Sequence, residues 1–253
     1  MKIVSWNVNG LRACLEKGLA DYLADSDAGI IAIQETKTNT PLAGFPVKGY
    51  SAAWGVGDRP GYSGTLCLFK ETPISVLPGF GENNAFDARS RVITLKYRDF
   101  YFINVYAPNS YGDRSKWYYR LDWDTALAEY IDSLHSQNKA LIICGDFNVA
   151  HKHIDIFPES TRNDKDPPGF SSEERGGFDR LLEFGLVDVF RWLHPDLEGA
   201  YTWWVPKKRK QNKGRRLDYF LVSESLIPRV QSCGIRPDVF GSDHAPVELI
   251  IDI

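Results

Sequence analysis

Polar side chains stand at the ends of several apolar strand patterns, where they could do acid–base or metal-binding chemistry. The residues at these strand ends are Asn7, Asn9, Glu35, Asp146 and Asn148. Any one of them could simply form a turn, because Asn and Asp commonly follow strands in turns. Their repetition favours a functional site instead, because strand ends are rigid platforms for reactive side chains. Carboxylates accept protons from water, and oxygen ligands suit hard divalent cations.

A further polar group lies close to the C-terminus. Asp243 and His244 fall between a polar turn and the last apolar pattern, where such a pair is usually solvated. Asp218, in contrast, lies inside an apolar strand pattern, and burying a carboxylate there is costly unless it has a partner. A histidine nitrogen is a natural partner, so the sequence suggests that Asp218 and His244 meet.

The elements that must position these residues are mainly strands. Short apolar, β-branched runs occur along almost the whole chain. They span residues 2–6, 29–34, 50–54, 64–69, 91–97, 100–106, 140–145, 217–222 and 246–251. Helical patterns cover residues 11–24 and 117–134, and Ser171 and Glu174 have capping-box spacing at the start of a third helix. So many strands require two sheets, and we predict two packed sheets with helices outside.

The bulk composition predicts one soluble domain over residues 1–253. With 43% apolar residues the chain can bury a large core, and no low-complexity linker divides it. We find no export signal and no apolar stretch of roughly 20 residues, and we expect a cytoplasmic protein without membrane contact. The four cysteines are scattered without metal-binding or redox spacing, which predicts free thiols.

One segment is strongly basic, although the net charge of −3 disfavours nonspecific coating of nucleic acid by the whole chain. Its seven cations, with no acid among them, are Lys207, Lys208, Arg209, Lys210, Lys213, Arg215 and Arg216. The segment could be an ordinary solvated loop. Trp203 and Trp204 come just before it, however, and rings beside cations favour nucleic-acid binding. It overlaps one of two long irregular stretches, residues 157–170 and 205–214, which indicate binding loops or disordered segments.

Nine segments, spread over the chain in order, together resemble the exonuclease III type of AP endonuclease. They are SWNVNGLRA (5–13), QETK (34–37), GYSGT (61–65), NVYAPNS (104–110), CGDFNVAH (144–151), GFSSEER (169–175), YTWW (201–204), RLDYFLVS (216–223) and GSDHAPVEL (241–249). A chance match of so many independent motifs is very improbable. The resemblance implies a four-layer α/β sandwich, in which two packed, mostly antiparallel sheets are flanked by helices.

The same resemblance implies an activity. Members of this family hydrolyse phosphodiester bonds of double-stranded DNA with the help of Mg²⁺, and Mn²⁺ is an alternative ion. We therefore expect a monomeric DNA repair nuclease that acts as an AP endonuclease at abasic sites and as a 3′-to-5′ exonuclease at 3′ ends.

Roles near the metal and the attacking water follow from the resemblance, position by position. Glu35 is expected to ligate Mg²⁺, with Asn9 and Asp243 contributing directly or through water. Asp146 is the expected general base for the attacking water, and Asn7 orients it. A carboxylate base of this kind typically contributes about 10²–10⁴-fold in rate.

Further roles concern the phosphate that is cut. The resemblance implies that Asn148 and His244 contact it, that Asp218 holds the imidazole, and that Tyr106 and Asn109 complete the cradle. These donors suit a phosphodiester because negative charge grows on its oxygens during in-line attack. The residues do not distinguish a one-metal from a two-metal site, because that depends on distances between carboxylates.

Residues expected to contact DNA outside the cradle follow from the same comparison. They are Tyr62, Arg91, Lys37, Trp203, Lys207, Arg215 and Leu217. One departs from the family pattern, because Arg215 stands where the typical motif Gly-Trp-Arg-Leu-Asp-Tyr has Trp in the pocket for the baseless sugar. Trp203 and Leu217 match the other walls of that pocket. The loop after Asp155 also looks longer than usual.

These departures leave alternatives open. One is a 3′-end exonuclease with weak selectivity for abasic sites, because an arginine in the sugar pocket could reach a phosphate or stack on a base. Another is a lipid or inositol phosphodiesterase of the same superfamily, which shares the Glu, Asp-x-Asn and Ser-Asp-His elements. A third is a noncatalytic nucleic-acid-binding module, which the filled catalytic positions disfavour.

Overall fold

The computed structural model describes residues 1–45, 47–57, 59–81, 86, 90–111, 114–137, 139–162 and 164–253. Within these residues the chain forms two six-stranded sheets. The first has the order β13 (Val230–Ile235), β14 (Val247–Ile251), β1 (Lys2–Asn7), β2 (Ile30–Gln34), β4 (Thr65–Phe69) and β3 (Ser51–Gly55). The second has the order β5 (Ser75–Pro78), β6 (Val92–Lys96), β7 (Phe100–Tyr106), β8 (Ala140–Asp146), β12 (Asp218–Ser223) and β9 (Leu186–Asp188).

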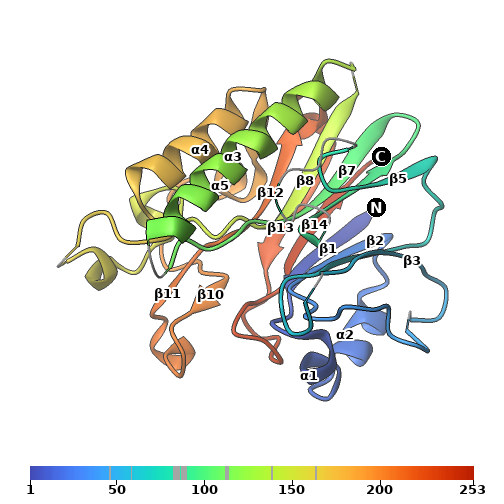
Figure 1. Cartoon of the computed structure of the whole chain (residues 1–253), viewed down its shortest axis with the longest axis horizontal. Coiled ribbons are helices and arrows are strands. Elements are labelled where there is room, and N and C mark those ends of the chain that lie inside the picture. Colours follow the sequence, from blue (N-terminus) through green and yellow to red (C-terminus); the bar gives the residue numbers. More distant parts are fainter. Residues whose placement is uncertain are drawn as a thin grey trace.

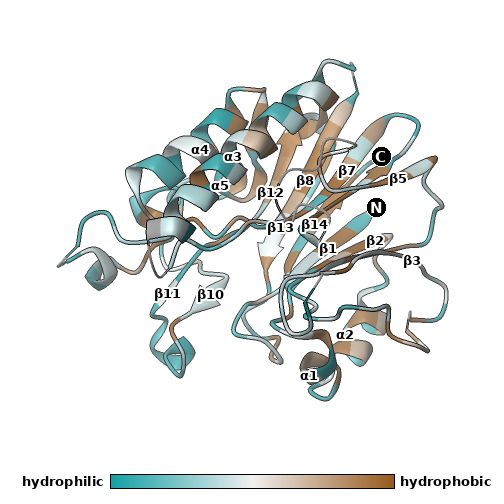
Figure 2. Cartoon of the chain, viewed as in Figure 1, coloured by the Kyte–Doolittle hydropathy of each residue, from teal (hydrophilic) through white to brown (hydrophobic). Residues whose placement is uncertain are grey.

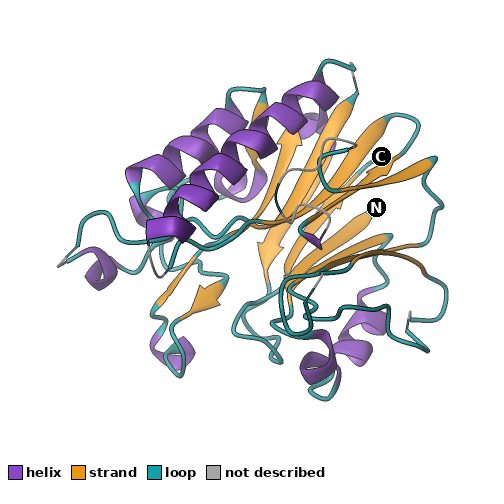
Figure 3. Cartoon of the chain, viewed as in Figure 1, coloured by secondary structure: helices purple, strands orange, loops and turns teal. Residues whose placement is uncertain are grey.

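Helices cover the outer face of each sheet (Figures 1 and 3). Beside the first sheet lie α1 (Leu11–Leu15) and α2 (Leu19–Ser26), and beside the second lie α3 (Arg114–His135) and α4 (Ser172–Leu182). Only the β1–β2 and β7–β8 pairs are parallel among the strand pairs of the described chain. The expected sandwich of two mostly antiparallel sheets flanked by helices is therefore confirmed.

Alternate residues of the central strands enter different cores. Ile3 and Phe102 belong to the core between the sheets, whereas Val4 packs under α1 and α2 and Ile103 packs under α3. Strands buried on both faces have continuous apolar sequences without visible alternation. Figure 2 accordingly shows mainly hydrophobic strands and largely hydrophilic α3 and α4. This explains why these strands were found from the sequence.

Other elements differ from the prediction. The helix expected over residues 11–24 is divided into α1 and α2 at Gly18, whose φ of 96° is left-handed and interrupts the helix. The capping box of α4 is present, since the Glu174 amide donates to Ser171 Oγ and the Ser171 amide donates to Glu174 Oε2, both at 3.2 Å. The irregular stretches contain the short 3₁₀ helices η3 (Pro158–Thr161) and η4 (Arg209–Gln211).

Several short elements were not predicted. They are β5, β9, β13, α5 (Val189–Leu193), the two-stranded ribbon of β10 (Trp203–Trp204) and β11 (Gly214–Arg215), and the 3₁₀ helices η2 (His153–Asp155) and η5 (Glu224–Arg229). Most are brief, and β5 and β13 are partly exposed, so they lack a long apolar run. The four cysteines are free and buried, as expected. In the described chain no helix combines the length and apolarity that crossing a membrane requires.

The two sheets bring the ends of the central strands together at one edge. Parallel pairing places the C-terminal ends of β1 and β2 side by side, and it does the same for β7 and β8. Antiparallel β12 begins where β8 ends, so that Asp218 lies opposite Asp146. A Cβ at Gly145 would lie 1.8 Å from the Val105 carbonyl oxygen, so only glycine permits the close approach of β7 just before Asp146.

A buried ionic network holds the start of β12 in place. Arg216, which is fully buried, donates to Asp155 at 2.8 and 2.9 Å and to Asp188 at 3.0 and 2.7 Å. Arg191 donates to Asp155 at 2.5 Å. Burial opposes ionisation of Asp155, but the two arginines outweigh it and hold its pKa below the ordinary value. Arg216 is thereby an internal brace next to Asp218.

Replacing Arg216 with Met is expected to lower the free energy of unfolding by about 3–5 kcal/mol, because the change leaves buried carboxylates short of a counter-charge. Denaturant unfolding measures this loss. Arg236→Met is the matched control, because Arg236 pairs with Asp238 at 3.0 Å on the surface, and its loss should stay below about 1 kcal/mol. Equal losses in both variants would contradict the bracing role.

Candidate active site

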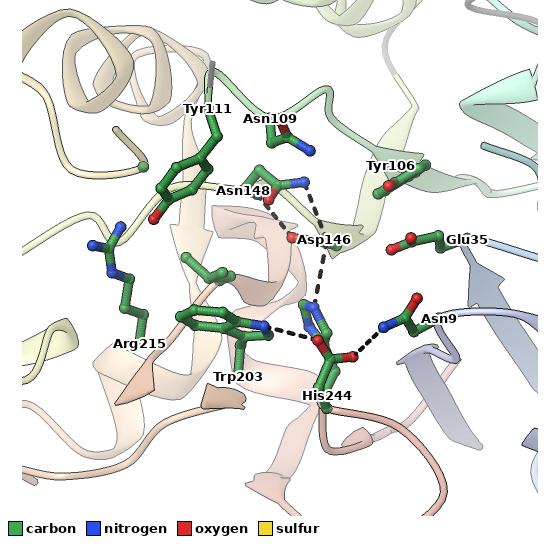
Figure 4. A pocket seen from close by; sticks show the side chains of 13 residues that line it. Asn9, Glu35, Tyr106, Asn109, Tyr111, Asp146, Asn148, Trp203, Arg215 and His244 are labelled. Atoms are coloured by element: carbon green, nitrogen blue, oxygen red, sulfur yellow. Dashed lines mark hydrogen bonds and ion pairs between the residues drawn. The ribbon is translucent and has the colours of Figure 1, made fainter. Parts of the chain in front are cut away.

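A cavity of about 190 Å³ opens at the edge where the strand ends meet. Its lining comes from both sheets and from the loops beyond them, as Figure 4 shows. The lining residues are Asn9, Glu35, Tyr106, Asn109, Tyr111, Asp146, Asn148, Gly169, Trp203, Arg215, Leu217, Asp243 and His244. Most of the expected site residues therefore converge on one cavity, although they are far apart in the sequence.

The Asn7 side chain joins two carboxylates from different sheets. Its amide nitrogen donates to Asp146 Oδ2 at 2.8 Å and to Glu35 Oε2 at 3.0 Å, and its oxygen accepts from the Asn9 amide at 2.9 Å. Asn7 is fully buried beneath the cavity. Asp146 also accepts from Asn148, through the backbone amide at 2.9 Å and the side-chain amide at 3.2 Å. Both carboxylates are thus fixed at the floor of the cavity.

Left-handed backbone conformations bring these side chains into the cavity. Asn9, Glu35 and Asn148, which line the cavity, have φ angles of 45°, 57° and 50°. Such a conformation costs on the order of 1 kcal/mol or more for a residue other than glycine, and it occurs preferentially at functional sites. The strand ends are therefore bent at some energetic cost, and the bends turn the polar side chains inward.

Asp218, His244 and Asp146 form a buried charged group. His244 Nδ1 lies 2.8 Å from Asp218 Oδ2, and His244 Nε2 lies 4.0 Å from Asp146 Oδ2. The expected meeting of Asp218 and His244 is therefore present. The ligand atoms of the three residues lie within 4.8 Å of one another, so the cluster could hold a metal ion.

The charges in this group shift one another's protonation. Burial lowers the pKa of His244, but Asp218 and Asp146 outweigh it and raise the pKa to about 10. Burial raises the pKa of Asp146 to about 7, opposed by His244 and assisted by Asp218. Asp218 Oδ1 is buried without a hydrogen-bond partner, so the imidazole at Oδ2 is the side-chain partner of this carboxylate. At neutral pH, His244 is consequently a cation.

Donors for an anion surround this group. Burial, reinforced by Glu35 and Asp146, raises the pKa of Tyr106 well above its ordinary value, so the phenol keeps its proton. Asn148 donates to the Ala107 carbonyl at 2.8 Å, which ties its amide to the loop after β7. Asn109 lies in the same loop and is exposed at the cavity.

Oxygen donors for a hard cation lie on the other side of the cavity. Asn9 donates to Asp243 Oδ1 at 2.9 Å, which places the expected ligands Asn9 and Asp243 together. Lys37 Nζ lies 3.0 Å from Glu35 Oε1 and also donates to Asn9 Oδ1. A positive charge is thus already held between the oxygens of Glu35 and Asn9. The all-oxygen donor set suits Mg²⁺.

The pocket expected to receive the sugar has a changed wall. Trp203 and Leu217, the other expected walls, line the cavity, and Trp203 Nε1 donates to Asp243 Oδ2 at 3.1 Å. Their contact with a sugar stays a prediction. Arg215 donates to the Pro168 carbonyl at 2.5 Å, and its guanidinium lies 5.9 Å from the centre of the Tyr111 ring. Tyr111 was not predicted, although it directly follows the NVYAPNS motif. An arginine and a tyrosine thus form one wall of the pocket.

Two buried charges that were not predicted support the loops of the cavity. Arg120, on α3, donates to the carbonyls of Pro108 and Phe147, both at 2.7 Å. Glu174, on α4, accepts from Ser110 Oγ at 2.7 Å and from the Gly169 amide at 2.8 Å. These contacts hold the loops that carry Asn109 and Asn148. Glu174 could have been noticed because it lies in the GFSSEER motif, whereas Arg120 lies in an ordinary helical pattern.

The cations of the basic segment differ in their surroundings, so the segment as a whole is not the ordinary solvated loop that the sequence left open, and the nucleic-acid binding favoured there stays a prediction. Arg216 is buried in the network described above, and Arg209 is half-buried and donates to backbone carbonyls. Lys207 is exposed and lies outside the cavity. The cations differ in burial because some arginines donate hydrogen bonds to buried carboxylates and carbonyls, while the ammonium groups of lysines favour water.

Tyr62, Arg91 and Lys37 lie beside the cavity rather than within it. Arg91 donates to the Tyr62 hydroxyl at 2.8 Å, and both residues line a second cavity of about 640 Å³. Tyr106 and Asn109 line both cavities, so the two adjoin. The DNA contacts expected of these residues stay predictions.

Comparisons with known proteins agree with this geometry. The model of the Endonuclease/Exonuclease/phosphatase family matches residues 4–244. An exodeoxyribonuclease of Bacillus subtilis (strain 168) is 46% identical over 257 residues, which cover 100% of both chains. The DNA repair nuclease APEX1 of Danio rerio is 38% identical over 260 residues, which cover 100% of this chain and 83% of the relative.

Solved structures share the fold over nearly the whole chain. A 3′-5′ exonuclease (NExo) from Neisseria meningitidis has a TM-score of 0.88 at 29% identity, with 100% of both chains covered. The AP endonuclease LMAP from Leishmania major has a TM-score of 0.87 at 31% identity, with 98% of this chain and 86% of that chain covered. The chain belongs to the Endonuclease/Exonuclease/phosphatase family.

Proposed function

We propose that this protein is a Mg²⁺-dependent DNA repair nuclease that hydrolyses phosphodiester bonds, both at abasic sites and at 3′ ends of duplex DNA. One observation carries the proposal: Asp146 is fixed by the Asn7 amide at 2.8 Å and faces the cationic His244 across 4.0 Å. The names of the full-length relatives, an exodeoxyribonuclease and a DNA repair nuclease, support it.

Asp146 is suited to take a proton from the attacking water. With a pKa raised to about 7, its carboxylate is largely ionised at slightly alkaline pH and is still a useful base. Asn7 and Asn148 donate to it, so its orientation is fixed before substrate arrives. A base that is already oriented needs no reorganisation during the reaction.

The donors opposite Asp146 are suited to hold the phosphate. His244 offers a charged N–H at Nε2, and Asn109 and the Tyr106 phenol offer neutral donors around the same cavity. Asn148 lines the cavity too, and it would have to exchange its bond to Asp146 or Ala107 to donate to a phosphate. The 4.0 Å between His244 Nε2 and Asp146 Oδ2 exceeds a hydrogen bond, so a phosphate oxygen can accept from the imidazolium. Charge that grows on phosphate oxygens meets fixed positive partners.

Glu35, Asn9 and Asp243 would hold the Mg²⁺ ion. When bound, the ion supplies positive charge that offsets the charge developing on the phosphate and on the departing oxygen. Lys37, which pairs with Glu35 at 3.0 Å, keeps the carboxylate oriented toward the cavity. The cluster of Asp146, Asp218 and His244 then serves proton transfer and phosphate binding and does not hold the metal.

A second candidate is a 3′-end exonuclease with weak selectivity for abasic sites. The observation that favours it is the wall of the sugar pocket, where Arg215 and Tyr111 face each other at 5.9 Å. A bare sugar gains little from a charged wall, whereas a terminal nucleotide offers a base for stacking. The similarity to a solved 3′-5′ exonuclease is consistent with this candidate.

A panel of labelled duplexes tests the proposed function. It comprises an internal abasic site, a nick, a blocked 3′ end and an RNA–DNA hybrid, each with and without Mg²⁺. Asp146→Asn is expected to lose at least about 10²-fold in Mg²⁺-dependent cleavage while it still binds duplex, because the general base is removed. The exposed Asp99→Asn is the control and should keep full activity. Unchanged turnover in Asp146→Asn would remove this residue from the mechanism.

A plot of kcat/KM against pH should be bell-shaped, with an acidic limb and an alkaline limb. Activity falls as pH drops below about 7, where Asp146 gains a proton, and falls again as pH rises through about 10, where His244 loses one. In Asp218→Asn, burial still disfavours the imidazolium but its main counter-charge is gone, so the alkaline limb moves to lower pH. Asp179→Asn removes the partner of a different histidine, His151, and should leave both limbs in place. An alkaline limb that stays fixed in Asp218→Asn would refute the assignment of His244.

The ratio of abasic-site cutting to 3′-end trimming tests the changed pocket wall. Arg215→Trp is expected to raise this ratio, because an apolar ring fits a baseless sugar better than a guanidinium does. The comparison uses the two substrates under identical conditions, with Arg180→Trp on the exposed side of α4 as control. A ratio that does not change would show that Arg215 has no part in selectivity.

A further inference from the structure

Arg209 differs from the exposed lysines beside it in the basic segment. Its guanidinium donates to three backbone carbonyls of one neighbouring segment: to Pro237 at 3.1 Å, Val239 at 2.8 Å and Ser242 at 3.2 Å. Lys208 on its N-terminal side is exposed. Arg209 therefore faces inward from the loop and joins it to residues 237–242.

Two aromatic rings contact this guanidinium. Its centre lies 4.2 Å from the Trp204 ring centre and 4.8 Å from that of Phe240. Trp204 is buried and donates to Asn212 at 2.9 Å, so it is itself fixed within the loop. A planar guanidinium can stack on rings and donate in its plane at the same time, which an ammonium cannot do.

The carbonyl of Ser242 connects this contact to the catalytic cavity. Ser242 Oγ donates to the Asn7 carbonyl at 2.8 Å and accepts from the His244 amide at 3.2 Å. Trp204 adds a second link, because its amide donates to the Asp243 carbonyl at 3.3 Å. The segment held by Arg209 therefore continues directly into His244 and contacts Asn7.

We propose that Arg209 is a positioning residue, which couples DNA contact by the basic loop, residues 205–213, to the placement of Asp243 and His244. This inference rests on the proposed nuclease function. Exposed lysines of the loop attract the phosphate backbone and set the affinity. Arg209 transmits the resulting position of the loop to the turn that carries the catalytic histidine.

The coupling predicts different kinetic effects for neighbouring cations. Arg209→Lys and Arg209→Ala are expected to lower kcat roughly 10- to 100-fold, because small displacements of catalytic groups cost that much. Their Kd for duplex, measured in EDTA, should change less than about threefold, the size of one weak phosphate contact. Lys208→Ala is the matched control and should weaken binding and reduce its salt dependence, with little change in kcat.

Chemical rescue separates positioning from general damage to the fold. Methylguanidinium added to Arg209→Ala should restore part of kcat, because it can contact the rings of Trp204 and Phe240 and donate to the same carbonyls. Methylammonium at equal ionic strength should not. Thermal unfolding of each variant shows whether it is folded. If Arg209→Ala does not fold, the kcat of Arg209→Lys alone tests the positioning role.

Two results would overturn the inference: a kcat of Arg209→Lys equal to that of the original protein, or a loss confined to Kd as in Lys208→Ala. Failure of the proposed function is distinguishable, because the unmodified protein would then not cleave duplex DNA at all. Cleavage by the unmodified protein without a kcat effect in the Arg209 variants rejects only the positioning role.

Discussion

The site depends on one amide that bridges two carboxylates. Asn7 donates to Asp146 at 2.8 Å and to Glu35 at 3.0 Å, and these acids come from different sheets. Two carboxylates would repel each other in a buried cavity unless donors were shared between them. The amide supplies those donors without adding charge, so one acid can serve as a base while the other remains available to a cation. The spacing of the two sheets therefore determines whether Asn7 can reach both carboxylates.

Buried ion pairs beyond the cavity extend the same arrangement. Arg216 fixes the chain just before Leu217 and Asp218, and Arg120 fixes the loops that carry Asn109 and Asn148. Such pairs contribute little to net stability relative to apolar side chains, but breaking one is expensive. Their value here is geometric, since each donates to backbone or carboxylate oxygens that lie next to site residues. The reactive groups lie on loops, and buried charges make those loops rigid.

Much of this organisation could be predicted from the sequence. The central strands were found because burial on both faces gives long apolar runs, and the polar residues at their ends indicated the site edge. The contact of Asp218 with His244 followed from the cost of an unpaired carboxylate in a strand. Edge strands such as β5 and β13 were missed because they are half exposed. The division of α1 from α2 was missed because the apolar pattern continues past Gly18.

The charged residues were harder to assign, for a physical reason. Lys208, Arg209 and Arg216 look alike in a basic run, yet one is solvated, one contacts two aromatic rings and one is buried with carboxylates. The partners that determine the surroundings of each cation lie up to 61 residues away, so the neighbouring sequence does not show them. Arg120 poses the same problem, because a helix pattern does not reveal that loop carbonyls surround its guanidinium. Tyr111 was missed because its place opposite Arg215 depends on two loops that meet only in the folded chain.

The antiparallel register of β8 and β12 has an implication for how this chain can change. Asp218 lies opposite Asp146, and neighbouring residues of a strand face opposite sides of the sheet. Inserting or deleting one residue in β12 would turn Asp218 into the helix-covered layer and present Leu217 or Tyr219 to the imidazole. Length variation in this strand therefore displaces Asp218 unless a β-bulge absorbs the extra residue, whereas the surface loops can accept it. Diversification of this enzyme must proceed through its loops and through point substitutions.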